Sequence, residues 1–166
     1  MQEKENKINM KTTLIVVGRT VENYFINAIE EYVKRTQRYL QFNIEVIPEL
    51  KNTKNLSENV QKEKEGELII NSLQPGDYVV LLDEGGKEMR SVEFAEYMRK
   101  KMNTINKRLV FFIVGPYGFS QDVYKRTDEK MSLSKMTFSH QMVRLIFVEQ
   151  LYRAMSILNG SPYHHE

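Results

Sequence analysis

Cysteine is absent from this chain of 166 residues. Without a thiol the protein can form no disulfide, offer no thiolate to a metal and use no thiol nucleophile, and this absence suits a reducing cytoplasm. Long hydrophobic runs are missing too, because the longest, Leu109 to Val114, is far shorter than the roughly 20 residues of a membrane-spanning helix. The N-terminus has charges where a signal peptide has its apolar segment. We therefore expect a soluble cytoplasmic protein that contacts no membrane.

An excess of charge of one sign is also missing. The 24 basic and 22 acidic side chains leave a net charge of +2, so bulk electrostatics do not indicate a nucleic-acid-binding protein and any RNA site has to be local. The hydrophobic content of 41% is sufficient for one core. Residues 1–9 are polar and show no apolar periodicity. We expect a disordered extension over residues 1–9 and a single domain over residues 10–166.

Apolar runs typical of buried strands alternate with helical patterns along the rest of the chain. Because parallel neighbours need crossover helices, and continuous apolar strands indicate burial on two faces, this alternation predicts an α/β fold with a mostly parallel sheet and helices on both faces. Ligands bind such sheets beyond the carboxyl ends of the strands. The predicted strands cover residues 12–17, 44–47, 78–82, 109–114 and 131–133, and the predicted helices begin at residues 21, 57, 91, 120 and 140.

Two glycine-rich turns follow predicted strands and are candidate ligand sites. Gly85 and Gly86 come shortly after Leu82, and Gly115-Pro116-Tyr117-Gly118 follows Val114. Glycine lets a backbone approach a ligand closely, and proline restricts the turn, although an ordinary strand-to-helix connection would use the same residues. The chain has neither the G-x-G-x-x-G fingerprint nor the phosphate-binding loop, which disfavours nicotinamide cofactors and nucleoside triphosphates.

The helix predicted over residues 140–158 is apolar on almost all sides, which indicates burial on more than one side. It can be a central core helix, or part of it can meet a second subunit across a two-fold axis. Glu149 and Arg153 lie one turn apart on this helix, where an ion pair can form. Charged side chains on so apolar a helix favour a functional role.

The tail after this helix contains Tyr163 and His164. Chain ends are often disordered. However, an aromatic ring and an imidazole that titrates near neutral pH are both suited to gripping a nucleobase. Because no carboxylate at helical spacing completes a ligand set beside the histidines, we expect no metal site.

Several short motifs occur together in one fixed order, and they cover the chain from Met10 to its end. On these motifs the chain resembles the ribosomal RNA large subunit methyltransferase H family of the SPOUT superfamily. The motifs are Val16-Val17-Gly18, Lys64-Glu65-Gly66, Leu81-Leu82-Asp83, Ile113-Val114-Gly115, Ser134 to His140, Glu149 to Ala154, and Tyr163-His164.

The resemblance implies an α/β fold with a C-terminal trefoil knot, an exception to the rule against threaded chains, and a homodimer. It implies that S-adenosyl-L-methionine is the cofactor, and that its methyl group goes to N3 of a pseudouridine in the 23S ribosomal RNA of assembled ribosomes. Proline at position 116, where the family often has a second glycine, cannot donate a backbone hydrogen bond. By position in the motifs, the implied cofactor pocket is lined by Leu82, Gly115, Leu133, Ser134, Lys135, Met136, Thr137 and Phe138.

Four candidates for the reaction follow from the motifs near the end of the chain: Tyr152, Arg153, Tyr163 and His164. Arginine can anchor a phosphate or polarise a base carbonyl, the aromatic rings can stack on a base, and His164 can accept the N3 proton. We expect that the tail of one subunit completes the site of its partner. Two other functions stay open, namely a non-catalytic ribosome-binding or RNA-binding module of the same fold and a SPOUT methyltransferase that acts on transfer RNA.

Overall fold

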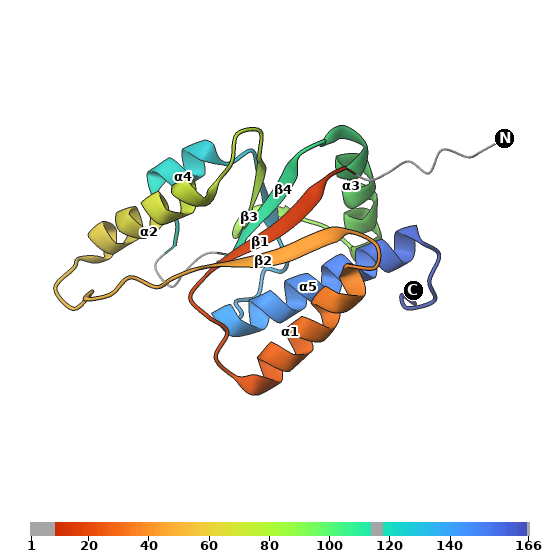
Figure 1. The fold of residues 1–166 in the computed structure, drawn as a ribbon, viewed down its shortest axis with the longest axis horizontal. Coiled ribbons are helices and arrows are strands. Elements are labelled where there is room, and N and C mark those ends of the chain that lie inside the picture. The colour runs from red at the N-terminus through yellow and green to blue at the C-terminus, as the bar shows by residue number, and fades with distance from the viewer. Residues whose placement is uncertain (1–8, 114–117, 166) are drawn as a thin grey trace.

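Five parallel strands form one sheet through the middle of the protein (Figure 1). The structure is a computed structural model that describes residues 9–113 and 118–165, so of the extension expected over residues 1–9 only Asn9 is described. The strand order is β2-β1-β4-β3-β5. The strands are β1 (Lys11–Val17), β2 (Gln41–Ile47), β3 (Tyr78–Glu88), β4 (Arg108–Ile113) and β5 (Glu129–Ser132).

Helices cover both faces of this sheet, which confirms the predicted α/β architecture (Figure 1). In the described residues one face carries three helices, of which one packs against both others, and the other face carries two that pack on each other. On the first face lie α1 (Asn23–Thr36), α3 (Ser91–Thr104) and α5 (His140–Leu158), and on the second lie α2 (Glu58–Ser72) and α4 (Gln121–Arg126).

The central strand β4 is buried along its whole length and contributes side chains to two separate cores. Because successive side chains of a strand point to opposite faces, Phe111 packs against Phe147 of α5, with 4.8 Å between the ring centroids, whereas Phe112 joins the core on the other face with Val123 of α4. A continuous apolar strand is thus the direct consequence of burial on two sides.

Three helices begin at a serine whose hydroxyl accepts a backbone N–H from the first turn, an arrangement that stabilises a helix start by about 1 kcal/mol. The distances are 3.2 Å at Ser57, 3.3 Å at Ser120 and 3.2 Å at Ser139. These caps confirm the helix starts predicted after Ser57 and Ser120. Next to Ser120, a Cβ on Gly66 would lie 2.2 Å from the Ser120 hydroxyl. Glycine in the second helix therefore allows α2 and α4 to approach closely.

Strand β3 is longer than predicted. We expected it to end at Leu82 before a glycine turn, but it continues to Glu88, and its pairing with β5 changes register between Leu82 and Lys87. Within this irregular stretch, a Cβ on Gly86 would lie 2.6 Å from the backbone N of Met131. The glycine thus serves a close approach of two strands, a role that local sequence does not distinguish from a turn.

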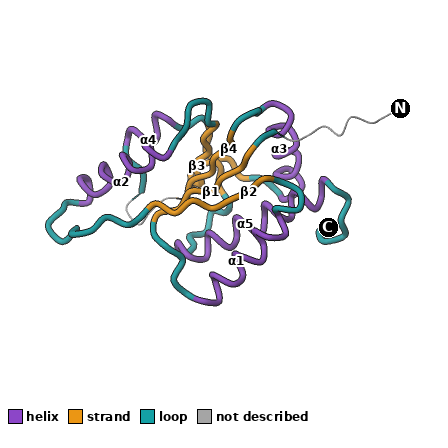
Figure 2. Tube along the Cα trace, viewed as in Figure 1, coloured by secondary structure: helices purple, strands orange, loops and turns teal. Residues whose placement is uncertain are grey.

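Helix α5 runs from the carboxyl end of the sheet toward the amino end, alongside α1 (Figure 2). Phe147, Val148 and Leu151 are buried against the sheet and its neighbouring helices, so this face is part of the core. Met142 is exposed, and Ile146, one turn further along, is half-buried and outside the two cores. The helix is therefore a core helix with a second, partly exposed apolar side.

Candidate functional site

A cavity of about 370 Å³ opens at the carboxyl end of β4, where the pairing between β3 and β4 stops and where ligands bind in parallel sheets. Ile113 comes from the end of β4 and Leu82 from the middle of β3, and the segment from Ser132, the last residue of β5, to Phe138 forms another wall. His140 and Val143 from the first turn of α5 complete that side. The volume lies in the range of small-molecule sites.

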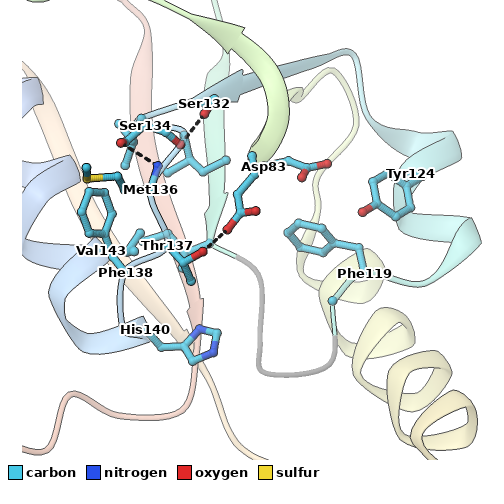
Figure 3. A pocket seen from close by; sticks show the side chains of 15 residues that line it. Asp83, Phe119, Tyr124, Ser132, Ser134, Met136, Thr137, Phe138, His140 and Val143 are labelled. Carbon is cyan, nitrogen blue, oxygen red and sulfur yellow. Dashed lines mark hydrogen bonds between the residues drawn. The ribbon is translucent and has the colours of Figure 1, made fainter.

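The segment that follows β5 is held in shape by its own polar groups. The Ser132 hydroxyl donates to the carbonyl oxygen of Ser134 at 2.9 Å, and the Ser134 hydroxyl accepts the N–H of Met136 at 3.0 Å (Figure 3). The Thr137 hydroxyl donates to Glu84 Oε1 at 3.0 Å, which ties the segment to β3. These bonds fix a loop whose apolar side chains would otherwise be free to collapse.

Carboxylates and aromatic rings form the opposite wall. Asp83 and Glu84 come from β3, and Phe119 and Tyr124 come from the region of α4, with 5.8 Å between the two ring centroids. Burial raises the pKa of the Tyr124 phenol, and the charge of Asp83 raises it further. Tyr124 therefore stays a neutral hydrogen-bonding group at physiological pH.

Six of the eight residues predicted for the cofactor pocket line this cavity. Lys135 does not, because its side chain is 87% exposed and its Nζ lies 3.9 Å from Glu88 on the outer surface. Gly115, like Pro116 beside it, lies outside the described residues. The six are Leu82, Leu133, Ser134, Met136, Thr137 and Phe138.

Sequence reasoning did not assign several residues of the cavity a role. Asp83 and His140 stand inside the motifs that carried the resemblance, and that position was a usable signal. Phe119 and Tyr124 had no such signal, because their place in the wall depends on how α4 packs against the sheet.

The four candidate reaction residues converge at the other end of α5. Glu149 Oε1 accepts from Arg153 Nε at 3.1 Å and also from Arg153 Nη2 and the Tyr163 hydroxyl, the latter at 3.0 Å. The Arg153 guanidinium lies over the Tyr163 ring, 4.8 Å from its centroid, and Tyr163 contacts Tyr152 edge to face at 4.7 Å. The predicted Glu149–Arg153 pair is confirmed, and it organises the tail.

Helix α1 adds aromatic and basic side chains to this cluster. The Tyr32 and Tyr163 hydroxyls lie 3.2 Å apart, and the Arg35 guanidinium lies 5.7 Å from the centroid of the Tyr152 ring. Tyr39 stacks on Tyr152 at 6.5 Å. Burial raises the pKa of Tyr163 well above its usual value, and its hydrogen bonds to Tyr32 and Glu149 raise it further. We call the side chains of Tyr32, Arg35, Glu149, Tyr152, Arg153, Tyr163 and His164 the tail cluster.

The contact between Arg153 and His164 decides which nitrogen of His164 carries its proton. Arg153 Nη1 lies 3.1 Å from His164 Nδ1, and because a guanidinium can only donate, Nδ1 has to be the lone-pair nitrogen. The neutral ring therefore has its proton on Nε2. Arg153 thus occupies the lone pair of His164 Nδ1 in this arrangement.

The cavity and the tail cluster are separate in one chain. His140 lines the cavity and Arg153 belongs to the tail cluster, and thirteen residues on one straight helix separate them by about 20 Å.

Two other features concern the described residues only. None of their helices is long and apolar enough to cross a membrane, and no group of three or more histidine or acidic side chains among them could hold a metal ion.

A family model described as predicted SPOUT methyltransferase matches residues 10–164, and this chain belongs to that family. Membership implies the trefoil knot and the general use of S-adenosylmethionine. Curated relatives named ribosomal RNA large subunit methyltransferase H match at 72% identity in Bacteroides thetaiotaomicron and 71% in Bacteroides fragilis strain YCH46, each over 95% of this chain and 100% of the relative. A similarly named protein of Flavobacterium psychrophilum is 55% identical over the same shares.

Proposed function

We propose that this protein transfers the methyl group of S-adenosylmethionine to N3 of a pseudouridine in the 23S ribosomal RNA of assembled ribosomes, in the cytoplasm. One observation carries the proposal: in a chain of the SPOUT family, six of the eight residues expected to hold the cofactor line one cavity at the carboxyl end of β4. The names of the relatives support the ribosomal RNA substrate.

The residues of the cavity suit this cofactor. Leu82, Leu133 and Phe138 offer apolar surface for an adenine ring, and the Ser134 and Thr137 side chains offer polar atoms beside it. Asp83 supplies negative charge for a cationic ligand. When bound, S-adenosylmethionine supplies a methyl group already activated by its sulfonium centre, so the protein has chiefly to position the nucleophile and exclude water.

The tail cluster supplies groups for an RNA base. Arg153 can hold a phosphate or a base carbonyl through its planar donors, and Tyr152 and Tyr163 can stack on a base as aromatic side chains do on unpaired nucleotides. His164 serves as proton acceptor only after Arg153 releases Nδ1. Binding of a negatively charged substrate by Arg153 is one event that would release it.

A homodimer would bring the two halves of the site together. In one chain His140 and Arg153 lie about 20 Å apart along α5, and the polar atoms of the tail cluster bond to one another and not to residues of the cavity. An apolar surface is present near the cavity: Val21 and Tyr24 are 71% and 66% exposed, Met142 is exposed on α5, and the N–H of Val21 donates to Gln141 at 3.0 Å. This surface, packed on a second copy across a two-fold axis, would let the tail cluster of one subunit face the cavity of its partner.

Transfer of labelled methyl groups tests the substrate. Purified protein and labelled S-adenosylmethionine are incubated with unmethylated ribosomes, separated subunits, naked ribosomal RNA and transfer RNA, and the labelled nucleotide is mapped. Label on N3 of a 23S pseudouridine in whole ribosomes supports the proposal. Label on transfer RNA alone would replace the substrate, and binding to ribosomes without any transfer would favour a non-catalytic module.

Mixed dimers test the shared site. One chain lacks residues 161–166, the other carries Thr137→Arg in the cavity, and each carries a different affinity tag so that the mixed dimer can be isolated. We expect both parent dimers to be inactive and the mixed dimer to recover about half the wild-type activity, because one of its two sites is intact. An inactive mixed dimer would show that each site is built from one chain.

A further inference from the structure

The described lining of the cavity carries negative charge and no positive charge. Asp83 and Glu84 contribute carboxylates, and no lysine or arginine stands among the described lining residues. The ammonium of Lys135, on the same loop as the lining, points outward to Glu88. The remaining ionisable lining groups are His140 and Tyr124. An apolar cavity with this charge balance favours a ligand with positive charge.

Asp83 is better placed than Glu84 to act on a bound ligand. Glu84 is exposed and accepts a hydrogen bond from Thr137, so it is occupied in holding the loop. Asp83 is half-buried, receives from the described part of the chain only the weak N–H contact of Gly85 at 3.3 Å, and extends toward the side where Phe119 and Tyr124 lie (Figure 3). The charge of Asp83 adds to the effect of burial in raising the pKa of the Tyr124 phenol, in agreement with its place beside this wall.

We infer that Asp83 makes the pocket select the methyl donor over its spent product by charge. S-adenosylmethionine and S-adenosylhomocysteine share the adenosine, the ammonium and the carboxylate, and differ by the methyl group and by the positive charge on sulfur. Asp83 attracts that extra charge and has no corresponding attraction to the neutral thioether. Loss of the sulfur charge on methyl transfer thus weakens the hold on the product and assists its release.

The cavity is small enough for Asp83 to attract the sulfonium at any position of the sulfur inside it. A cavity of about 370 Å³ is comparable in width with the Debye length of about 8 Å at physiological salt. Salt therefore screens the attraction between Asp83 and an enclosed cation only in part. The apolar lining lowers the local dielectric constant, which strengthens the same attraction.

Ligand binding by the unlabelled protein tests the inference without any catalytic readout. The dissociation constants of S-adenosylmethionine, S-adenosylhomocysteine and sinefungin, in which an amine-bearing carbon replaces the sulfonium, are measured by calorimetry for the wild type and for Asp83→Asn. Glu88→Gln removes the same charge from the same strand outside the cavity and is the matched control. Thermal unfolding of each variant checks that the fold is intact.

We expect Asp83→Asn to weaken the two ligands with the extra cationic centre by about tenfold, equivalent to about 1.4 kcal/mol, and S-adenosylhomocysteine by less than about twofold. Glu88→Gln should leave all three unchanged. Equal weakening of all three ligands by Asp83→Asn would overturn the inference, because the carboxylate would then act on the shared ammonium, and so would no weakening at all. The inference rests on the proposed function: a wild-type protein that binds none of the ligands refutes both, whereas normal wild-type binding with equal losses refutes the inference alone.

Discussion

The two ends of α5 present different chemistry. At its start, His140 and Val143 face a cavity lined mainly by apolar side chains and a hydrogen-bonded loop, with carboxylates as its only described permanent charges. Near its other end, Glu149 and Arg153 gather tyrosines and a histidine whose polar atoms bond to one another. The first region leaves space for a small molecule, and the second is filled by its own side chains.

This difference indicates that the two regions bind different ligands. A shaped cavity of low polarity is suited to a small cofactor, whereas exposed or half-buried arginine and tyrosine side chains are suited to RNA. Because one rigid helix connects the two regions, neither can move to the other within a chain. Variants at the two ends should therefore have separable effects on cofactor binding and on turnover.

The largest effect is expected from Thr137→Arg. Thr137 lines the cavity but is exposed, so a long cationic side chain there fills the space at little cost to folding. We expect cofactor affinity to fall by at least about a hundredfold, while the free energy of unfolding falls by about 1 kcal/mol or less, because the exposed hydrogen bond to Glu84 is lost. Calorimetry and urea unfolding measure the two quantities.

Lys135→Ala is the matched control in the same loop. Its side chain points away from the cavity, so affinity should stay within about twofold of the wild type. A loss as large as that of Thr137→Arg would mean that Lys135 binds cofactor, as the motif position implies, and would contradict the described geometry.

Arg153→Ala should give the next largest effect, at the other end of α5. Removing the guanidinium takes away the donors that we propose for the substrate, and also the partner of His164. We expect kcat to fall on the order of 100-fold, with the cofactor dissociation constant unchanged. Single-turnover methylation and calorimetry separate the two. A similar loss of cofactor affinity would contradict the idea that the two ends of α5 bind different ligands.

Glu149→Gln should have a smaller effect, because Glu149 acts through Arg153 and Tyr163. Hydrogen bonds to a charged group contribute about 1.5–3 kcal/mol each, and an amide retains part of them, so we expect turnover to fall by about tenfold. Glu96→Gln breaks a similar pair with Arg99 on α3, away from the tail cluster, and should leave turnover unchanged. Equal turnover of wild type and Glu149→Gln would show that the hydrogen bonds of Glu149 to Arg153 and Tyr163 are not needed for the reaction.

The smallest effect concerns Tyr163→Phe and pH. The variant loses hydroxyl contacts to Glu149 and Tyr32, which should lower stability by about 1 kcal/mol near neutral pH. Burial first, then these two contacts, raise the pKa of Tyr163 in the folded protein above its ordinary value of 10.0. Its contribution is therefore complete below pH 10 and is lost as pH rises through the folded value.

Urea unfolding between pH 7 and pH 11 measures this dependence. The difference between wild type and Tyr163→Phe should narrow at the alkaline end, and Tyr24→Phe, at a largely exposed ring, serves as control. A constant difference over the whole range would mean that the hydroxyl of Tyr163 is not held in solution as it is in the structure.

Much of the fold was predictable because the signals are local. A continuous apolar run predicts β4, and a long run of apolar residues predicts the bounds of α5. Ser57 and Ser120 predict helix starts because their hydroxyls can accept a backbone N–H. The length of β3 was not predictable, since a glycine pair suits a turn and a strand irregularity equally well. Only the approach of β5 shows which applies here.

For the site, the order of the motifs determined which residues belong together, because each motif keeps its residue types at fixed short spacing. Tertiary structure alone decided how they are used: Lys135 points outward, Asp83 points inward, and Tyr163 and His164 fold back on Glu149 and Arg153. Each of these outcomes depends on neighbours far away in the sequence. The direction of a side chain and its partners are set by packing between elements, which short-range patterns do not encode.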